Sequence, residues 1–180
     1  VAASETTRRS RKQSSSTAGG RGARFAVTAL STSLMLTFGA SVHALPAGGV
    51  VAAGGATISS GAGSTTIKQS TANVVINWQS FGIAAGQAVQ FVQPGSGSVA
   101  LNRVLGANPS SIMGNLSANG KVFLLNPNGI LFGSGASVNV GGLVASTLSL
   151  TDANFMAGRY AFADAGSGTV VNQGTINAAD

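Results

Sequence analysis

Short apolar runs, separated by glycine, asparagine and proline, follow one another along most of the chain. The clearest pair is residues 122–125 and 130–132, which the tetrapeptide Asn126-Pro127-Asn128-Gly129 divides. Both runs are too short for helices, and each residue of the tetrapeptide suits its position in a β-turn. The stretch therefore predicts a strand, a tight turn and a second strand. Because neither run alternates with polar residues, we expect strands buried on both faces of a mostly parallel sheet.

Further strands are expected wherever an apolar run lies between two turn signals. They cover residues 73–78, 88–93, 99–104, 136–140, 143–150, 160–162, 169–171 and 175–177, with weaker candidates at 50–51, 57–58 and 66–67. Residues 111–116 suit either a short strand or one helical turn, and residues 152–157 suit a short helical turn.

The spacing of these strands, roughly ten residues, is compatible with a sandwich, a barrel or a β-solenoid. The segments are short, lack the long alternating strands of a sandwich, and have asparagine and glycine at their corners. Residues 171–177 resemble the opening of another coil. An all-β solenoid is therefore the fold class that we expect, with each coil packing on its neighbours.

The first 44 residues differ from the rest. Residues 1–24 are basic, residues 25–40 are uncharged and moderately apolar, and Val42-His43-Ala44 has a small-x-small pattern. These features are typical of a secretory signal peptide cleaved between Ala44 and Leu45. A membrane anchor is the alternative, but the apolar run is shorter than the roughly 20 residues that a span needs. We expect a signal at 1–44 and one domain at 45–180.

Most of the positive charge lies in the same first 44 residues. The formal net charge is +6, yet six basic residues and one acidic residue lie in the leader, against four and three in residues 45–180. The domain is therefore nearly neutral, which argues against a nucleic-acid partner.

The inventory of reactive side chains in residues 45–180 is small. The only histidine, His43, lies in the leader, and the chain has no cysteine. Zinc sites, cysteine nucleophiles and Ser-His-Asp triads are thereby excluded for this region, and no cofactor is expected. Asp152 and Asp164 are interpreted as solvated turn residues. Residues 115–117 (Asn-Leu-Ser) match a glycosylation sequon, a weak signal.

An ordered set of short motifs is more specific than any one of them. The set contains residues 77–81 (Asn-Trp-Gln-Ser-Phe), 91–94 (Phe-Val-Gln-Pro), 101–104 (Leu-Asn-Arg-Val), 112–114 (Ile-Met-Gly), 118–129, 131–133 and 145–147. It resembles the N-terminal secretion domain of filamentous haemagglutinin-type exoproteins of the two-partner pathway, especially the high-molecular-weight adhesin branch. The positions that match the family pattern are Asn77, Trp78, Phe81, Gln93, Pro94, Asn102, Arg103, Asn119 and Gly120, together with the turn at 126–129. The family's second motif, Asn-Pro-Asn-Leu, is absent, and residues 108–111 do not match it.

The resemblance implies a right-handed parallel β-helix with an N-terminal cap and some extra-helical antiparallel strands. It implies export by the Sec machinery, then recognition in the periplasm by an outer-membrane transporter of the Omp85 type. The complete protein would be an adhesin of a Gram-negative bacterium, secreted or held on the cell surface. A host receptor or glycan would bind to the region beyond residue 180. No enzyme activity is implied for this domain.

Two alternatives remain open at this point. A β-helix polysaccharide lyase or hydrolase would need acids beside Arg103, Lys121 or Arg159, and a purely structural fibre module would need no recognition at all. Single residues have plain structural interpretations too: Trp78 as a core side chain, and Arg103 as the partner of a carbonyl or an aspartate. Asn126 and Asn128 would then stabilise their own turn.

Overall fold

The computed structural model describes residues 45–179, so the predicted signal peptide and Ala44 lie outside the described residues. The elements are β1 (Val50–Ala53), β2 (Ala56–Gly61), β3 (Ser64–Gln69), β4 (Asn73–Trp78), β5 (Ala88–Val92), β6 (Val99–Val104), β7 (Ser110–Ile112), β8 (Asn115–Ala118), β9 (Lys121–Leu125), β10 (Ile130–Phe132), β11 (Ser137–Val140), β12 (Gly142–Ser146), α1 (Asp152–Met156), β13 (Val170–Asn172) and β14 (Thr175–Ala178). Within this part of the chain, no helix is long and apolar enough to cross a membrane.

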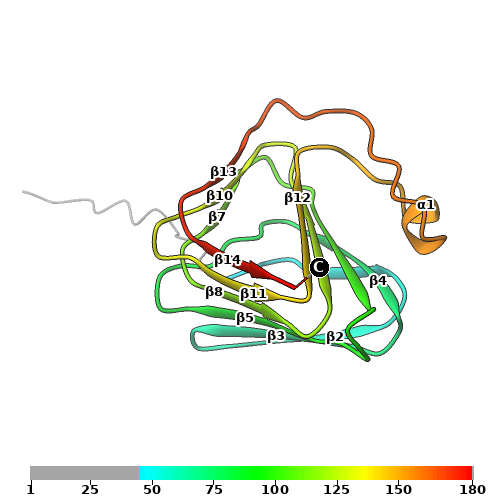
Figure 1. The fold of residues 1–180 in the computed structure, drawn as a ribbon, viewed down its shortest axis with the longest axis horizontal. Helices are drawn as coiled ribbons and strands as arrows, with labels where there is room; N and C mark the ends of the chain where they lie inside the picture. Colours follow the sequence, from blue (N-terminus) through cyan, green and yellow to red (C-terminus); the bar gives the residue numbers. More distant parts are fainter. Residues whose placement is uncertain (1–44, 180) are drawn as a thin grey trace, which may run out of the picture. The chain divides into compact units, whose positions relative to one another are not determined.

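The strands form three sheets that wrap around one core (Figure 1). Their orders are β1-β4-β6-β9-β12, β14-β11-β8-β5-β3-β2 and β13-β10-β7. Strands β5, β6 and β7 make one coil, β8, β9 and β10 make the next, and all neighbouring strands of successive coils are parallel. The predicted β-solenoid is therefore confirmed, with about three turns.

In the interior, the register of the coils places apolar side chains directly above apolar side chains of the preceding coil. Val74 pairs with Ala100, Ala100 with Val122, and Val122 with Leu143, so one register position supplies an apolar side chain from each coil. The first three are fully buried. Burial of each larger side chain of this kind stabilises the fold by about 1.5–3 kcal/mol, which suits a chain without disulfides.

The sheet that contains β9 is buried on its outer face as well. Val75, Leu101 and Phe123 share the next register position, point away from the interior, and form a second apolar cluster with Leu150 and Phe155. The last two belong to residues 147–168, which leave the solenoid after β12 and return at β13 (orange, Figure 1). The expectation of strands buried on both faces is thus confirmed for β9, and an external segment provides the second layer.

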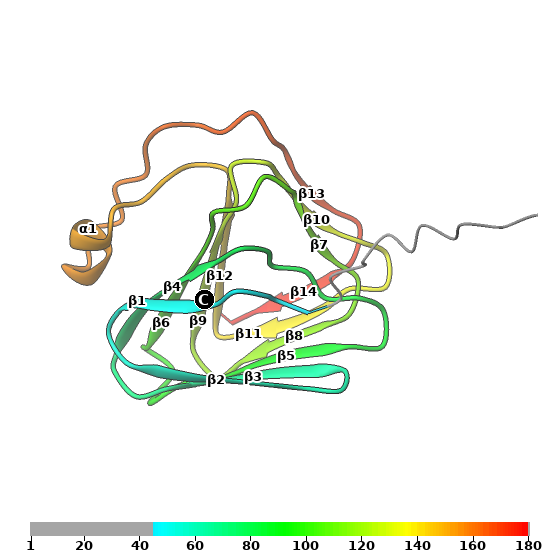
Figure 2. The same cartoon turned by 180° about the vertical axis from the view of Figure 1, so that it is seen from behind.

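Antiparallel strands cap the first coil. Strand β1 pairs with β4 and β2 pairs with β3, both antiparallel, while the rest of each sheet is parallel (Figure 2). These two strands are the N-terminal cap and the antiparallel additions that were expected. They occupy sheet edges that would otherwise expose unpaired backbone groups.

Three segments differ from the sequence-based expectation. Residues 160–162 form no strand, because Tyr160 and Phe162 pack their rings against Phe123, with centroid distances of 5.0 and 6.3 Å. The strand predicted at 143–150 ends at Ser146, where the external segment begins. Residues 111–116 are neither one strand nor a helical turn, since Met113 and Gly114 make a corner between β7 and β8.

Candidate functional site

The tetrapeptide at 126–129 forms the corner between β9 and β10. The Gly129 N–H donates to the Asn126 carbonyl at 3.1 Å, which closes the β-turn, and the Asn128 N–H donates to Asn126 Oδ1 at 2.9 Å. Gly129 has φ of +112°, a backbone conformation that other residues adopt only with strain. The corner therefore depends on the residue types at its first and last positions.

Side chains of this corner bind the preceding coil. Asn126 is fully buried, and its Nδ2 donates to the Asn108 carbonyl and to Ser110 Oγ, both at 3.0 Å. Asn128 Nδ2 donates to the Gly106 carbonyl at 2.9 Å. The two amides thus satisfy, in place of water, two carbonyls of the loop that leads into β7 and the hydroxyl of Ser110, the first residue of that strand.

The backbone of the same corner binds the following coil. The Gly168 N–H donates to the Pro127 carbonyl at 3.0 Å, and the Ile130 N–H donates to the Thr169 carbonyl at 2.9 Å. A Cβ added at Gly168 would stand 2.2 Å from the Asn128 carbonyl carbon, so the two backbones touch. We call residues 126–129 with these contacts the corner clamp, because they join three successive levels of the solenoid.

A second group of amides joins coils at the corner that precedes β6 and β9. Gln93 Nε2 donates to Gln69 Oε1 at 3.0 Å, and the Gly120 N–H donates to Gln93 Oε1 at 2.9 Å. Asn119 accepts from the Gln93 N–H at 2.7 Å and donates to the Gln93 carbonyl at 2.9 Å. Family-pattern residues that are far apart in the sequence therefore form one amide ladder, with Pro94 exposed beside it.

Gln69 was missed by the sequence reasoning, although it belongs to this ladder. It is buried and donates to three backbone carbonyls, those of Thr71, Ala72 and Val99. A glutamine at the end of β3 and another just after β5 was the available signal, since the two strands pair in register.

Trp78 and Asn102 form a polar pair inside the apolar core. Trp78 Nε1 donates to Asn102 Oδ1 at 3.0 Å, and its ring meets Phe81 edge-on at 5.6 Å. Asn102 is fully buried and donates to the carbonyls of Ala100 and Phe123. Both residues thus act in packing, as the plain interpretation of Trp78 expected.

Arg103 holds the external segment against the solenoid. Its guanidinium donates to Asp152 Oδ1 at 2.7 Å, to the Leu150 carbonyl at 2.5 Å and to Asn77 Oδ1 at 3.0 Å. The interpretation of Arg103 as the partner of a carbonyl or an aspartate is confirmed. Asp152, interpreted as a solvated turn residue, is the first residue of α1, and its half-exposed carboxylate also forms this ion pair.

The arrangement of charged residues gives little support to the lyase or hydrolase alternative. A hollow of about 230 Å³ beside the clamp is lined by Arg103 and Asp164, with Asp164 as its single carboxylate. Glycoside hydrolysis requires a pair of carboxyl groups across the scissile bond. Ser149 Oγ lies 3.2 Å from Asp164, and Arg159 bonds Asn154, so these residues have local partners.

Comparison with known proteins places these features in a family. A family model described as the TPS secretion domain matches residues 42–180. Two heme/hemopexin-binding proteins of Haemophilus influenzae are 48% and 46% identical over 111 and 97 residues, which are 62% and 54% of this chain. The matches cover only 12% and 10% of those relatives. The crystal structure of the HMW1 secretion domain from Haemophilus influenzae superimposes with a TM-score of 0.69 at 36% identity, over 73% of this chain and 36% of that one.

Proposed function

Since this chain belongs to the TPS secretion domain family, we propose that residues 45–180 are the part of an exported protein that a dedicated outer-membrane transporter recognises. Residues 1–44 would then be the signal for the Sec machinery, removed between Ala44 and Leu45. The chain carries the secretion domain of an HMW1-like exoprotein, and no observation favours the enzymatic alternative.

The observation that carries this proposal is how successive coils are joined. Backbone pairing, the corner clamp and the amide ladder all link each coil to its immediate neighbours, and the chain has no cysteine. A protein built in this way can cross a membrane as an extended chain and then fold coil by coil outside. Folding on the far side would hinder its return through the transporter.

The corner clamp would act in this scheme through folding. Asn126, Asn128 and the Gly129 N–H direct their hydrogen bonds to the chain itself, while Pro127 is exposed at the surface. A side-chain amide that is satisfied internally has little capacity left for a partner. The same argument applies to Asn102, whose Oδ1 and Nδ2 are both bonded within the domain, and to the guanidinium of Arg103, which donates to Asn77, Leu150 and Asp152.

The transporter would be of the Omp85 type, with periplasmic domains that receive the chain before it crosses the outer membrane. The complete protein would be an adhesin secreted by, or held on the surface of, a Gram-negative bacterium. This chain spans about an eighth of the first relative's length, so heme, hemopexin, receptor or glycan binding would be a property of the region beyond residue 180. Residues 45–180 contain neither histidine nor cysteine to ligate a heme iron.

Export of an inert passenger tests the proposal. Residues 1–180 fused to the passenger should release it into the medium when the transporter is present, and leave it in the periplasm when the transporter is absent. Retention of the passenger in both strains would refute the proposal.

Deletion separates recognition from a purely structural role. Removal of residues 45–180 from the complete protein should stop its secretion if they are recognised. Continued secretion after the deletion would favour the structural fibre module.

A further inference from the structure

The residues that follow the predicted cleavage point are packed into the fold. Pro46 is buried, and Leu45 is half-buried against the apolar core. Strand β1 begins only at Val50, so residues 45–49 precede the first sheet and are nevertheless part of the folded domain. Among the described residues, no exposed spacer therefore separates this point from the domain.

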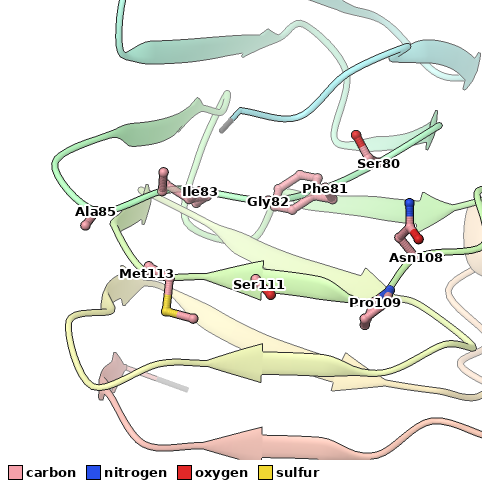
Figure 3. Close-up of a pocket in the computed structure, with 10 residues that line it drawn as sticks. Ser80, Phe81, Gly82, Ile83, Ala85, Asn108, Pro109, Ser111 and Met113 are labelled. Atoms are coloured by element: carbon pink, nitrogen blue, oxygen red, sulfur yellow. The ribbon is translucent and has the colours of Figure 1, made fainter. Parts of the chain in front are cut away.

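Backbone hydrogen bonds fix this segment to the first coil. The Ala47 N–H donates to the Ser80 carbonyl at 2.9 Å, and the Ala47 carbonyl accepts from the N–H groups of Gln79 and Ser80 at 3.0 and 3.3 Å. Figure 3 shows Ser80 at one end of residues 80–85, which pair with β7 through Ile83. Both hydrogen-bonding groups of the Ala47 backbone are thus used within the domain.

Gly49 lies directly against the core. A Cβ added there would stand 2.4 Å from Trp78 Cζ3 and 2.9 Å from Ile58 Cδ1. The Trp78 ring has no space to move aside, because it is 1% exposed and its Nε1 donates to Asn102. We call residues 45–49 the N-terminal latch, because packing and backbone pairing together hold them in place.

A signal peptidase needs this stretch in another arrangement. Peptidases hold the chain on both sides of the bond that they cut as an extended strand, through its backbone N–H and C=O groups. In the N-terminal latch those groups of Ala47 are bonded to Gln79 and Ser80, and Pro46 is buried. Cleavage of the folded chain therefore requires the latch to open first, and its rate follows the population of the opened state.

We propose that the N-terminal latch makes folding and signal removal mutually exclusive, so that the bond between Ala44 and Leu45 is a processing site only in the unfolded chain. Cleavage is a hydrolysis: water supplies a hydroxyl to the Ala44 carbonyl carbon and a proton to the Leu45 nitrogen as the bond between them breaks. A chain that folds before this step keeps its leader. Processing thereby selects chains that are still able to cross the outer membrane in an extended form. This proposal rests on the proposed function, which supplies the signal and its cleavage point.

The full chain, residues 1–180, and a purified signal peptidase test the N-terminal latch. The folded wild type is compared with the double variant Leu101→Asp/Leu124→Asp, which places two carboxylates at fully buried positions and keeps the chain unfolded without changing residues 1–49. Trp78 emission reports the state of each chain, and mass spectrometry follows the new N-terminus at Leu45. We expect the wild type to be cleaved at least about a hundredfold more slowly than the double variant.

Two glycine variants of the folded chain locate the effect. Gly49→Ala drives a Cβ into Trp78 and should displace the latch, so cleavage should be at least about tenfold faster than in wild type. Gly97→Ala is the matched control, because nothing lies within 4 Å of a Cβ there, and its rate should stay within about twofold of wild type.

The outcomes separate the latch from the proposed function. Equal cleavage of the folded wild type and the unfolded double variant would overturn the latch and leave the signal and passenger export intact. A folded Gly49→Ala chain cleaved as slowly as Gly97→Ala would also contradict it, and if Gly49→Ala does not fold, the first comparison decides alone. An unfolded double variant that is not cut before Leu45 would overturn the processing site together with the predicted signal, while passenger export would still test recognition by the transporter.

Discussion

Replacement of Asn126 by alanine tests the corner clamp most simply. The variant loses two donated hydrogen bonds, to the Asn108 carbonyl and to Ser110 Oγ, and the bond that Asn126 Oδ1 accepts from the Asn128 N–H. Asn108 is exposed, so water can replace its lost donor, but Ser110 is fully buried and keeps an unsatisfied hydroxyl. The bonds to Ser110 and from the Asn128 N–H contribute about 1 kcal/mol each, and the unsatisfied Ser110 hydroxyl costs about 1 kcal/mol more. We therefore expect the free energy of unfolding to fall by about 3 kcal/mol.

The assay is urea unfolding followed by tryptophan fluorescence. Trp78 is the only tryptophan of the sequence and is 1% exposed, so its emission reports whether the core is intact. For an m-value of about 2 kcal/mol/M, the midpoint should fall by about 1.5 M with m unchanged. Asn139→Ala is the matched control, because Asn139 is exposed on β11 and its change should cost under about 0.5 kcal/mol. Equal midpoints for Asn126→Ala and Asn139→Ala would refute the clamp.

Three further substitutions test other parts of the account. Gly129→Val should cost at least about 3 kcal/mol in the same unfolding assay, because φ is +112° and its Cβ would stand 3.0 Å from the Thr169 carbonyl oxygen; a cost below about 1 kcal/mol would contradict this. Gln93→Leu has a similar volume but leaves the Gly120 N–H and Gln69 Oε1 without partners, so we expect a loss of about 2–4 kcal/mol, and an unchanged midpoint would argue against the amide ladder. Arg103→Gln removes the ion pair with Asp152, so hydrogen exchange of residues 149–163 should accelerate while β4 and β6 stay protected; uniform acceleration would mean that Arg103 stabilises the whole fold.

Much of this architecture could be predicted from the sequence. Residues 73–78 and 99–104 were predicted as strands and form β4 and β6 with the same bounds, because each is an apolar run between clear turn signals. The turn at 126–129 was also predicted correctly, since asparagine, proline and glycine stand at the positions that a β-turn favours.

What the sequence could not supply was the partner of each polar group. Asn126 bonds residues 16 and 18 positions earlier and Gln93 bonds one 24 positions earlier, distances that follow from the register of the coils. The external segment was missed for a related reason. Tyr160 and Phe162 make an apolar run that suits a strand, but their rings cover Phe123 instead. A local pattern records that a residue is apolar and does not record which surface it covers.

The central claim is that the corner clamp serves export through folding, and one comparison tests it most directly. Passenger export and the free energy of unfolding would be measured for Asn126→Ala, Asn128→Ala and Gly129→Val. The core variant Leu124→Ala would be measured beside them, because Leu124 is fully buried and cannot touch a transporter. We predict that export falls with stability along one common curve for clamp and core variants alike. A clamp variant that unfolds at the wild-type urea concentration and is nevertheless retained in the periplasm would contradict the claim and make the corner itself the element that the transporter recognises.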